Sequence, residues 1–211
     1  MNEFEQGSEQ WLQARKGRFT SSQIYKLMTE PRTKAAKEAG ELSEGAKAYV
    51  MEKALELAYG CDFSFDGNDA TQWGNDWEAE ALATYEKQFF TTVERTGFVP
   101  DADFGGGSPD GIENGDTIIE IKTPYNEKNF FEVVYTGKYP KQYYWQVQDL
   151  MRITNCDAAR LVYFNPHEGR KYLYCFDIDR NEDDIARIEE KLLEAVKMRQ
   201  AIIDDLRAKL G

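Results

Sequence analysis

Histidine is almost absent from this chain of 211 residues, which contains His167 alone. A single imidazole excludes mechanisms and metal sites that need two, among them the zinc hydrolases that carry an H-E-x-x-H motif. Because His167 stands within the turn-forming stretch NPHEG, we expect it to lie in a surface turn.

Cysteines and long apolar runs are also scarce. The three cysteines are far apart and form no C-x-x-C motif, so they indicate neither a disulfide framework nor a cysteine-rich metal site: Cys61, Cys156 and Cys175. The N-terminal sequence MNEFEQGSEQ has acids where a signal peptide has bases, and no apolar run is long enough to span a membrane. We therefore expect a soluble, cytoplasmic protein without membrane association.

A basic excess, which usually marks a nucleic-acid partner, is missing as well, because the net charge is -12. The distribution of charge changes that picture. Residues 62–120 hold 14 acids and two bases, and they account for the whole net charge. Residues 15–37 instead hold seven bases and one acid. This polarised chain suits a protein that binds a polyanion with one segment and divalent cations with another.

Hydrophobic periodicity and capping signals predict helices and strands in mixed order. We expect a short helix after Ser8, a capping box at residues 20–23, a loop at 31–42 and a long helix at 43–59. Further helices are expected at 71–88, 126–135, 140–153 and 181–209, with strands at 97–100, 117–122, 159–165 and 171–178. The pattern predicts an α/β or α+β domain with a central mixed sheet flanked by helices.

The stretch around Asp110 and the strand TIIEIK contains the most informative polar residues. Alternation in that strand puts Glu120 and Lys122 on one face together with Ile118. If the hairpin loop is Glu113 to Gly115, Asp110 faces Ile118 and joins them, whereas a two-residue loop would pair it with Ile119. Two convergent carboxylates are suitable ligands for Mg²⁺ or Mn²⁺, and a lysine can orient water or stabilise phosphate charge. The alternative is a surface hairpin with an ion pair.

Three other groups of polar residues are candidates for a functional role, and each also has a purely structural interpretation. Winding the helix from Trp73 places Glu78 alone among its charges inside the apolar arc, where either a shared metal site or a core arginine would compensate it. Gln146 and Gln148 flank the apolar face of their helix, so they could order water, contact phosphate or simply mark its boundary. Arg15 and Ser22 lie near the expected helix start at Thr20, where free N–H groups form either an anion site or a solvated helix end.

Four segments occur in the order and approximate spacing found in bacteriophage lambda exonuclease and the related YqaJ-like viral recombinases, which belong to the PD-(D/E)xK nuclease superfamily. These segments are WLQARKGRFTSSQI, WGNDWEAEALATYE, SPDG with EIKTPY, and YYWQVQDLMRIT. The chain resembles this family over residues 8–178. The resemblance implies a restriction-endonuclease-like core and a single exonuclease domain over 1–211, in which residues 179–211 form a C-terminal helical tail.

The resemblance also implies roles for individual residues. Asp110, Glu120 and the Ile121 carbonyl would bind Mg²⁺, Lys122 would be the catalytic lysine, and Glu78 would bind or position a second metal or its waters. The other implied contacts involve the nucleophile and the DNA. Gln146 would help to order the nucleophile, Arg15, Ser22 and Ser108 would hold a terminal 5′-phosphate, and Gln148 would contact the DNA.

The implied activity is Mg²⁺-dependent 5′ to 3′ degradation of one strand of duplex DNA, with Mn²⁺ able to substitute. It leaves a 3′ overhang for a single-strand annealing protein, in a homotrimer within a bacterial or phage-infected cytoplasm. Two alternatives remain: a structure-selective or restriction-type endonuclease, and a non-catalytic scaffold that binds DNA ends.

Overall fold

The computed structural model describes residues 8–63, 68–102, 104–167 and 169–210. The chain divides into two compact units, each assembled from separate stretches. The first unit comprises Met1–Ser64, Gly97–Ser108 and Asn181–Gly211, and the second comprises Phe65–Thr96 and Pro109–Arg180. The prediction of one domain over 1–211 is not tested by this division, because the chain passes back and forth between the units.

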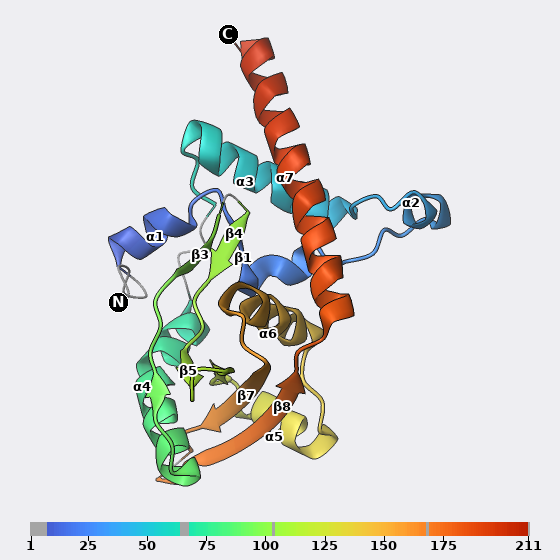
Figure 1. Ribbon diagram of the computed structural model, residues 1–211. Coiled ribbons are helices and arrows are strands. Elements are labelled where there is room, and N and C mark those ends of the chain that lie inside the picture. The colour runs from blue at the N-terminus through green and yellow to red at the C-terminus, as the bar shows by residue number, and fades with distance from the viewer. Residues whose placement is uncertain (1–7, 64–67, 103, 168, 211) are drawn as a thin grey trace. The chain divides into compact units, whose positions relative to one another are not determined.

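The first unit is mainly helical and contains a small sheet (Figure 1). In that sheet β4 lies between β1, to which it is parallel, and β3, to which it is antiparallel. Helices α3 and α7 pack against each other. The elements of this unit are α1 (Glu9–Arg15), β1 (Phe19–Thr20), η1 (Ser21–Lys26), α2 (Lys34–Glu38), α3 (Glu44–Tyr59), β3 (Val99–Asp101), β4 (Gly105–Gly107) and α7 (Glu182–Leu210).

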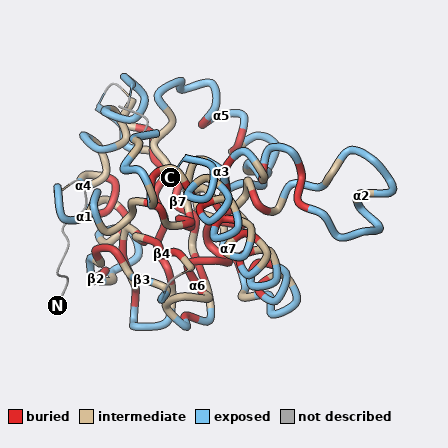
Figure 2. The backbone as a smooth tube through the Cα atoms, turned by 90° about the horizontal axis from the view of Figure 1, so that it is seen from above, coloured by how far each residue is buried: buried red, intermediate tan, exposed pale blue. Residues whose placement is uncertain are grey.

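Capping explains where several of these helices begin and end. The Ser8 side chain accepts a hydrogen bond from Trp11 N at the start of α1, and Ser43 caps α3 in the same way. Gly60 ends α3 in the left-handed conformation, as predicted. The predicted capping box at Thr20 is wrong, because Thr20 makes no side-chain cap bond and a 3-10 helix follows it. The expected loop at 31–42 contains the short α2, which buries no residue and is drawn mainly in pale blue in Figure 2.

The second unit contains a mixed five-stranded sheet in the order β2-β5-β6-β7-β8. Strands β6 and β7 are parallel and the other neighbours are antiparallel, so the predicted mixed sheet flanked by helices is confirmed. Helices α5 and α6 form the crossover that the parallel pair requires. The elements are α4 (Asp69–Phe89), β2 (Val93–Glu94), β5 (Gly111–Glu113), β6 (Thr117–Lys122), α5 (Glu127–Thr136), α6 (Lys141–Thr154), β7 (Ala158–Asn165) and β8 (Tyr172–Asp179).

Alternation along β6 divides the core of this unit into two layers. Ile118 packs into the cluster that includes the apolar residues of α5 and α6. Ile119 and Ile121 point the other way and pack with Ala81, Leu82 and other residues from α4. The predicted assignment of these residues to opposite faces is therefore confirmed, and it leaves Glu120 and Lys122 on the face that α6 covers.

Cys61 lies in the first unit, and Cys156, His167 and Cys175 lie in the second. All three cysteines are free. His167 is partly exposed in the loop after β7, where its Nδ1 lies 2.7 Å from Glu127 Oε1. Among the described residues no helix is both long and apolar enough to cross a membrane.

Candidate active site

The β5–β6 hairpin sets the position of Asp110. Glu113 pairs with Thr117, so the loop consists of residues 114–116, with Asn114 and Gly115 both at positive φ. The predicted three-residue loop has the right length but begins one residue later than Glu113, and this changes the residue opposite Asp110 by two positions from the predicted Ile118. Continuing the observed register by one residue places Asp110 opposite Glu120. A shift of two preserves the face, which is why the expected convergence survives the error.

Glu120, Lys122 and Gln146 form a compact hydrogen-bonded triangle. Lys122 Nζ lies 2.6 Å from Glu120 Oε1, and Gln146 Nε2 donates to the same oxygen at 2.7 Å. Lys122 also donates to Gln146 Oε1 at 3.3 Å. Both Glu120 and Gln146 are buried. Gln146 is therefore part of this cluster and not only a boundary residue of α6.

The two carboxylate oxygens of Glu120 differ in their hydrogen bonding. Both bonds from the triangle reach Oε1, whereas Oε2 is buried without a hydrogen-bond partner among the described residues. A buried carboxylate oxygen without a partner is energetically costly unless a cation or a donor compensates it. Its environment therefore suits a bound cation.

Asp110 is tied to the same strand by a backbone hydrogen bond. Its Oδ2 accepts from Ile121 N at 2.6 Å, which brings the carboxylate beside the Ile121 backbone. Burial, followed by the negative charges of Glu120 and Glu78, raises the pKa of Asp110 well above its ordinary value. Crowded carboxylates of this kind repel one another until a cation neutralises them.

Glu78 lies on α4 near this cluster, partly buried. Burial raises the pKa of Glu78, Arg95 opposes that rise, and Glu120 adds to it. Arg95 NH1 lies 3.9 Å from Glu78 Oε1, and the Arg95 side chain is 56% exposed, so this partner is not the core arginine considered as an alternative. Arg95 was missed by the sequence reasoning, because nothing in its local pattern connects the end of β2 with α4.

The donor set fits a magnesium ion held by few protein ligands. Asp110 and Glu120 supply carboxylates, Asp110 accepts a hydrogen bond from the backbone of Ile121, and Glu120 Oε2 has no hydrogen-bond partner in the described part of the chain. Mg²⁺ commonly takes one or two carboxylates and completes its shell with water and phosphate. In the described part of the chain no group of three or more Asp, Glu, His or Cys side chains forms a metal site, and the role of Glu78 in binding or positioning a second metal or its waters stays a prediction.

Lys122 is held as an ammonium. Burial lowers its pKa, but Glu120 and Asp110 outweigh burial and leave the pKa raised above its ordinary value. Its Nζ also lies 4.6 Å from the centre of the Tyr143 ring. Tyr143 was assigned only to the apolar face of α6, although its position one turn before Gln146 on that helix was a usable signal.

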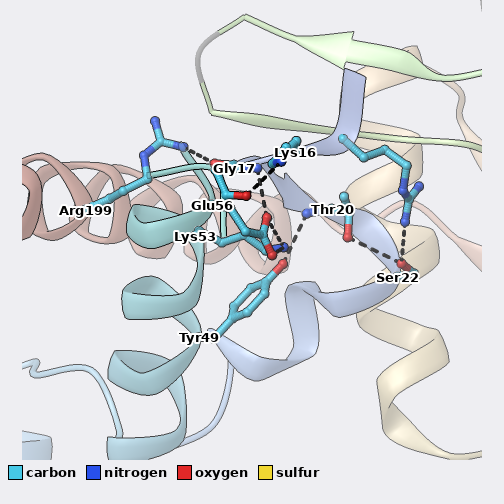
Figure 3. Close-up of polar contacts among 10 residues, drawn as sticks. Lys16, Gly17, Thr20, Ser22, Tyr49, Lys53, Glu56 and Arg199 are labelled. Carbon is cyan, nitrogen blue, oxygen red and sulfur yellow. Dashed lines mark hydrogen bonds and ion pairs between the residues drawn. The ribbon is translucent and has the colours of Figure 1, made fainter. Parts of the chain in front are cut away.

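A second cluster, in the first unit, contains the residues predicted to hold an anion. Arg15 donates to Ser22 Oγ at 3.4 Å, and its guanidinium lies 4.1 Å from the centre of the Trp11 ring. Ser22 is labelled in Figure 3. Trp11 Nε1 donates to Ser108 Oγ at 2.8 Å. Trp11 thus connects Arg15 with Ser108, a link that the sequence reasoning missed.

The guanidinium of Arg15 lies beside a hydroxyl and an aromatic ring. Burial lowers the pKa of Arg15 to about 10, which still leaves it cationic at neutral pH. Within the described ranges no carboxylate lies at ion-pair distance from it. A partly buried cation with a hydroxyl neighbour is a suitable receptor for an anion.

Gln148 does not fit its predicted role. The residue is fully buried, and its Nε2 donates to the backbone carbonyl of Asp179 at 2.8 Å. The side chain connects α6 to the end of β8, so the structure does not support a contact with DNA.

The two clusters belong to different units of the chain. Asp110, Glu120, Lys122 and Gln146 lie in the second unit, and Arg15, Ser22 and Ser108 lie in the first. The expectation that Arg15 lies near the carboxylates therefore stays a prediction.

The second unit is a mixed sheet with a helix layer on each face. Asp110, Glu120, Lys122 and Gln146 form a carboxylate–lysine cluster on this sheet. Residues 10–157 match the family model of the YqaJ-like viral recombinase domain, and the chain belongs to that family. A comparison with curated proteins gives no match.

Several solved structures are similar to the chain. An alkaline exonuclease (LHK-Exo) from Laribacter hongkongensis shares 27% identity at a TM-score of 0.80, covering 97% of this chain and 100% of its own; it has also been solved in complex with dAMP. A phage-related exonuclease from Haemophilus somnus 129PT shares 23% identity at a TM-score of 0.73, covering 90% of this chain and 96% of its own, and so shows the fold alone.

Proposed function

We propose that this chain is a Mg²⁺-dependent exonuclease that degrades one strand of duplex DNA from a 5′-phosphorylated end. The coarser activity, a phage-type DNA exonuclease, is supported by the family and by the similar alkaline exonuclease. The observation that carries the proposal is the cluster of Asp110, Glu120, Lys122 and Gln146, in which Glu120 and Gln146 are buried and Glu120 Oε2 has no partner among the described residues.

The residues of the cluster would have different roles in phosphodiester hydrolysis. Asp110, Glu120 and the Ile121 carbonyl would hold Mg²⁺, which when bound neutralises phosphate charge and lowers the pKa of water. The Lys122 ammonium donates to the attacking water or to a phosphate oxygen and stabilises the negative charge that develops there. Gln146 bonds to both Glu120 and Lys122, so it fixes the positions of the ligand and the ammonium.

The Arg15 cluster supports the proposed choice of DNA end. A terminal 5′-phosphate carries more charge than an internal phosphodiester, and Arg15 with the hydroxyls of Ser22 and Ser108 would bind it by charge-assisted hydrogen bonds. Holding that end would set the 5′ to 3′ direction. The 3′ overhang would serve a single-strand annealing protein, and a homotrimer would enclose the duplex.

The test uses linear duplex DNA with a 5′-phosphate on one strand only. With Mg²⁺ or Mn²⁺ we expect mononucleotides from the phosphorylated strand and an intact complementary strand. The complex of the similar exonuclease with dAMP agrees with a nucleotide product. Degradation from 3′ ends, or full activity in chelator, would refute the proposal.

Closed circular duplex separates the alternatives. A structure-selective or restriction-type endonuclease would cut it, whereas an exonuclease requires an end. A non-catalytic scaffold that binds DNA ends would leave both substrates intact. Lys122→Ala serves as the control, because nuclease traces that persist in this variant would identify the activity as contamination.

A further inference from the structure

The backbone between Arg15 and Ser22 turns sharply at Gly17. Lys16 has φ -63° and ψ 128°, Gly17 has φ 69°, and Arg18 N donates to Arg15 O at 3.1 Å. These values describe a type II β-turn, which favours glycine at its third position. Arg15 is the first residue of this turn, so the direction of the chain after Arg15 depends on the Gly17 peptide.

Two buried charged side chains hold Gly17 from separate helices (Figure 3). Glu56 of α3 accepts from Gly17 N at 2.9 Å, and Arg199 of α7 donates to Gly17 O at 2.6 Å. Glu56 is 7% exposed and Arg199 is 8% exposed. Lys53 compensates Glu56 at 2.8 Å from each carboxylate oxygen. Burying charged groups is costly, and their hydrogen bonds here converge on the amide and carbonyl of one residue in the turn.

The segment after the turn is held by the same helix α3. Thr20 N donates to the hydroxyl of Tyr49 at 3.3 Å, and Phe19 packs edge-on against the Tyr49 ring at 5.6 Å. Arg199 also lies 5.3 Å from the centre of the Phe19 ring. The backbone from Gly17 to Thr20 is therefore fixed on both sides, immediately before Ser22.

We propose that Arg199 and Glu56 are positioning residues for the 5′-phosphate, holding the Gly17 turn so that Arg15 and Ser22 face one anion. The inference rests on the proposed function, because it requires that Arg15 and Ser22 bind the terminal 5′-phosphate. It also means that α7 helps to position the phosphate-binding residues through Arg199, although this helix lies beyond the residues 10–157 that match the family model. Neither residue contacts the phosphate in this arrangement; each acts through the backbone of the turn.

The experiment compares Arg199→Met, Arg199→Lys and Glu56→Gln with the control Lys197→Met. Lys197 lies on the same helix and is exposed, so its variant removes the same charge without touching the turn. Each full-length protein is titrated in EDTA with fluorescent duplex carrying either a 5′-phosphate or a 5′-hydroxyl. Initial rates with Mg²⁺ then give KM and kcat for both ends, and a thermal melt confirms folding.

We expect Arg199→Met and Glu56→Gln to reduce the preference for the 5′-phosphate about tenfold, through Kd and KM, with kcat at saturating DNA unchanged. Arg199→Lys should restore part of the preference, and Lys197→Met should match the wild type. A folded Arg199 or Glu56 variant that keeps the wild-type preference overturns the inference, as does equal loss on both ends. Absence of any preference in the wild type instead refutes the proposed 5′-phosphate function. If Arg199→Met fails to fold, Glu56→Gln and Arg199→Lys decide.

Discussion

Replacing Gly17 with alanine should destabilise the protein more than the same change at Gly60. Both glycines have φ 69°, so alanine meets the same left-handed backbone strain, about 1–2 kcal/mol, at either position. A Cβ at Gly17 would lie 2.8 Å from Leu57 Cβ and 3.2 Å from Leu57 Cα, whereas a Cβ at Gly60 meets no atom within 4 Å. Overpacking against a fixed helix backbone adds about 1–3 kcal/mol at Gly17 alone.

The comparison is made by thermal melting of the two single variants and the wild type. At about 2–4 °C per kcal/mol for a chain of this size, Gly17→Ala should melt about 2–12 °C below Gly60→Ala. The pair cancels the common backbone strain, so the difference isolates the contact with Leu57. Equal melting temperatures for the two variants would refute the reasoning, since they would show that α3 yields freely to the new methyl group.

Three further predictions concern the carboxylate–lysine cluster and its helix. Lys122→Met should lower kcat about 100-fold or more with little change in DNA affinity, measured by single-turnover cleavage and by binding in chelator; wild-type kcat would exclude a catalytic role. Removing Mg²⁺ with EDTA should abolish cleavage of DNA. The Glu120→Gln variant should need a higher Mg²⁺ concentration than the wild type for cleavage, because the side chain at position 120 loses its negative charge. An unchanged Mg²⁺ titration of this variant would contradict a role of Glu120 in binding Mg²⁺. Gln148→Leu should cost about 1–3 kcal/mol in urea unfolding while DNA affinity stays the same, because the buried hydrogen bond to the Asp179 carbonyl is lost. Weaker DNA binding in a stable variant would restore the original prediction.

Local patterns predicted the long elements well. The strand at 117–122 has the expected bounds, and α3 begins after Ser43 and ends at Gly60 as expected. Strands of two or three residues, such as β1 and β5, were not predicted as strands, because so few residues carry no periodicity. The predicted capping box at Thr20 had the right spacing, but the Thr20 hydroxyl does not cap the helix. It lies 3.4 Å from the Ser22 hydroxyl, which accepts a hydrogen bond from Arg15.

The sequence by itself determined which residues share a face. Alternation in β6 places Glu120 with Lys122, and helical winding placed Glu78 on the inward side of α4, because both depend only on the repeat of one element. Tertiary structure alone decided the rest. The register of β5 against β6 depends on the turn, the link from Arg15 to Ser108 passes through Trp11, and Arg199 reaches Gly17 from a position 182 residues along the chain. Contacts between distant segments leave no local pattern in the sequence, since they depend on how separate elements pack.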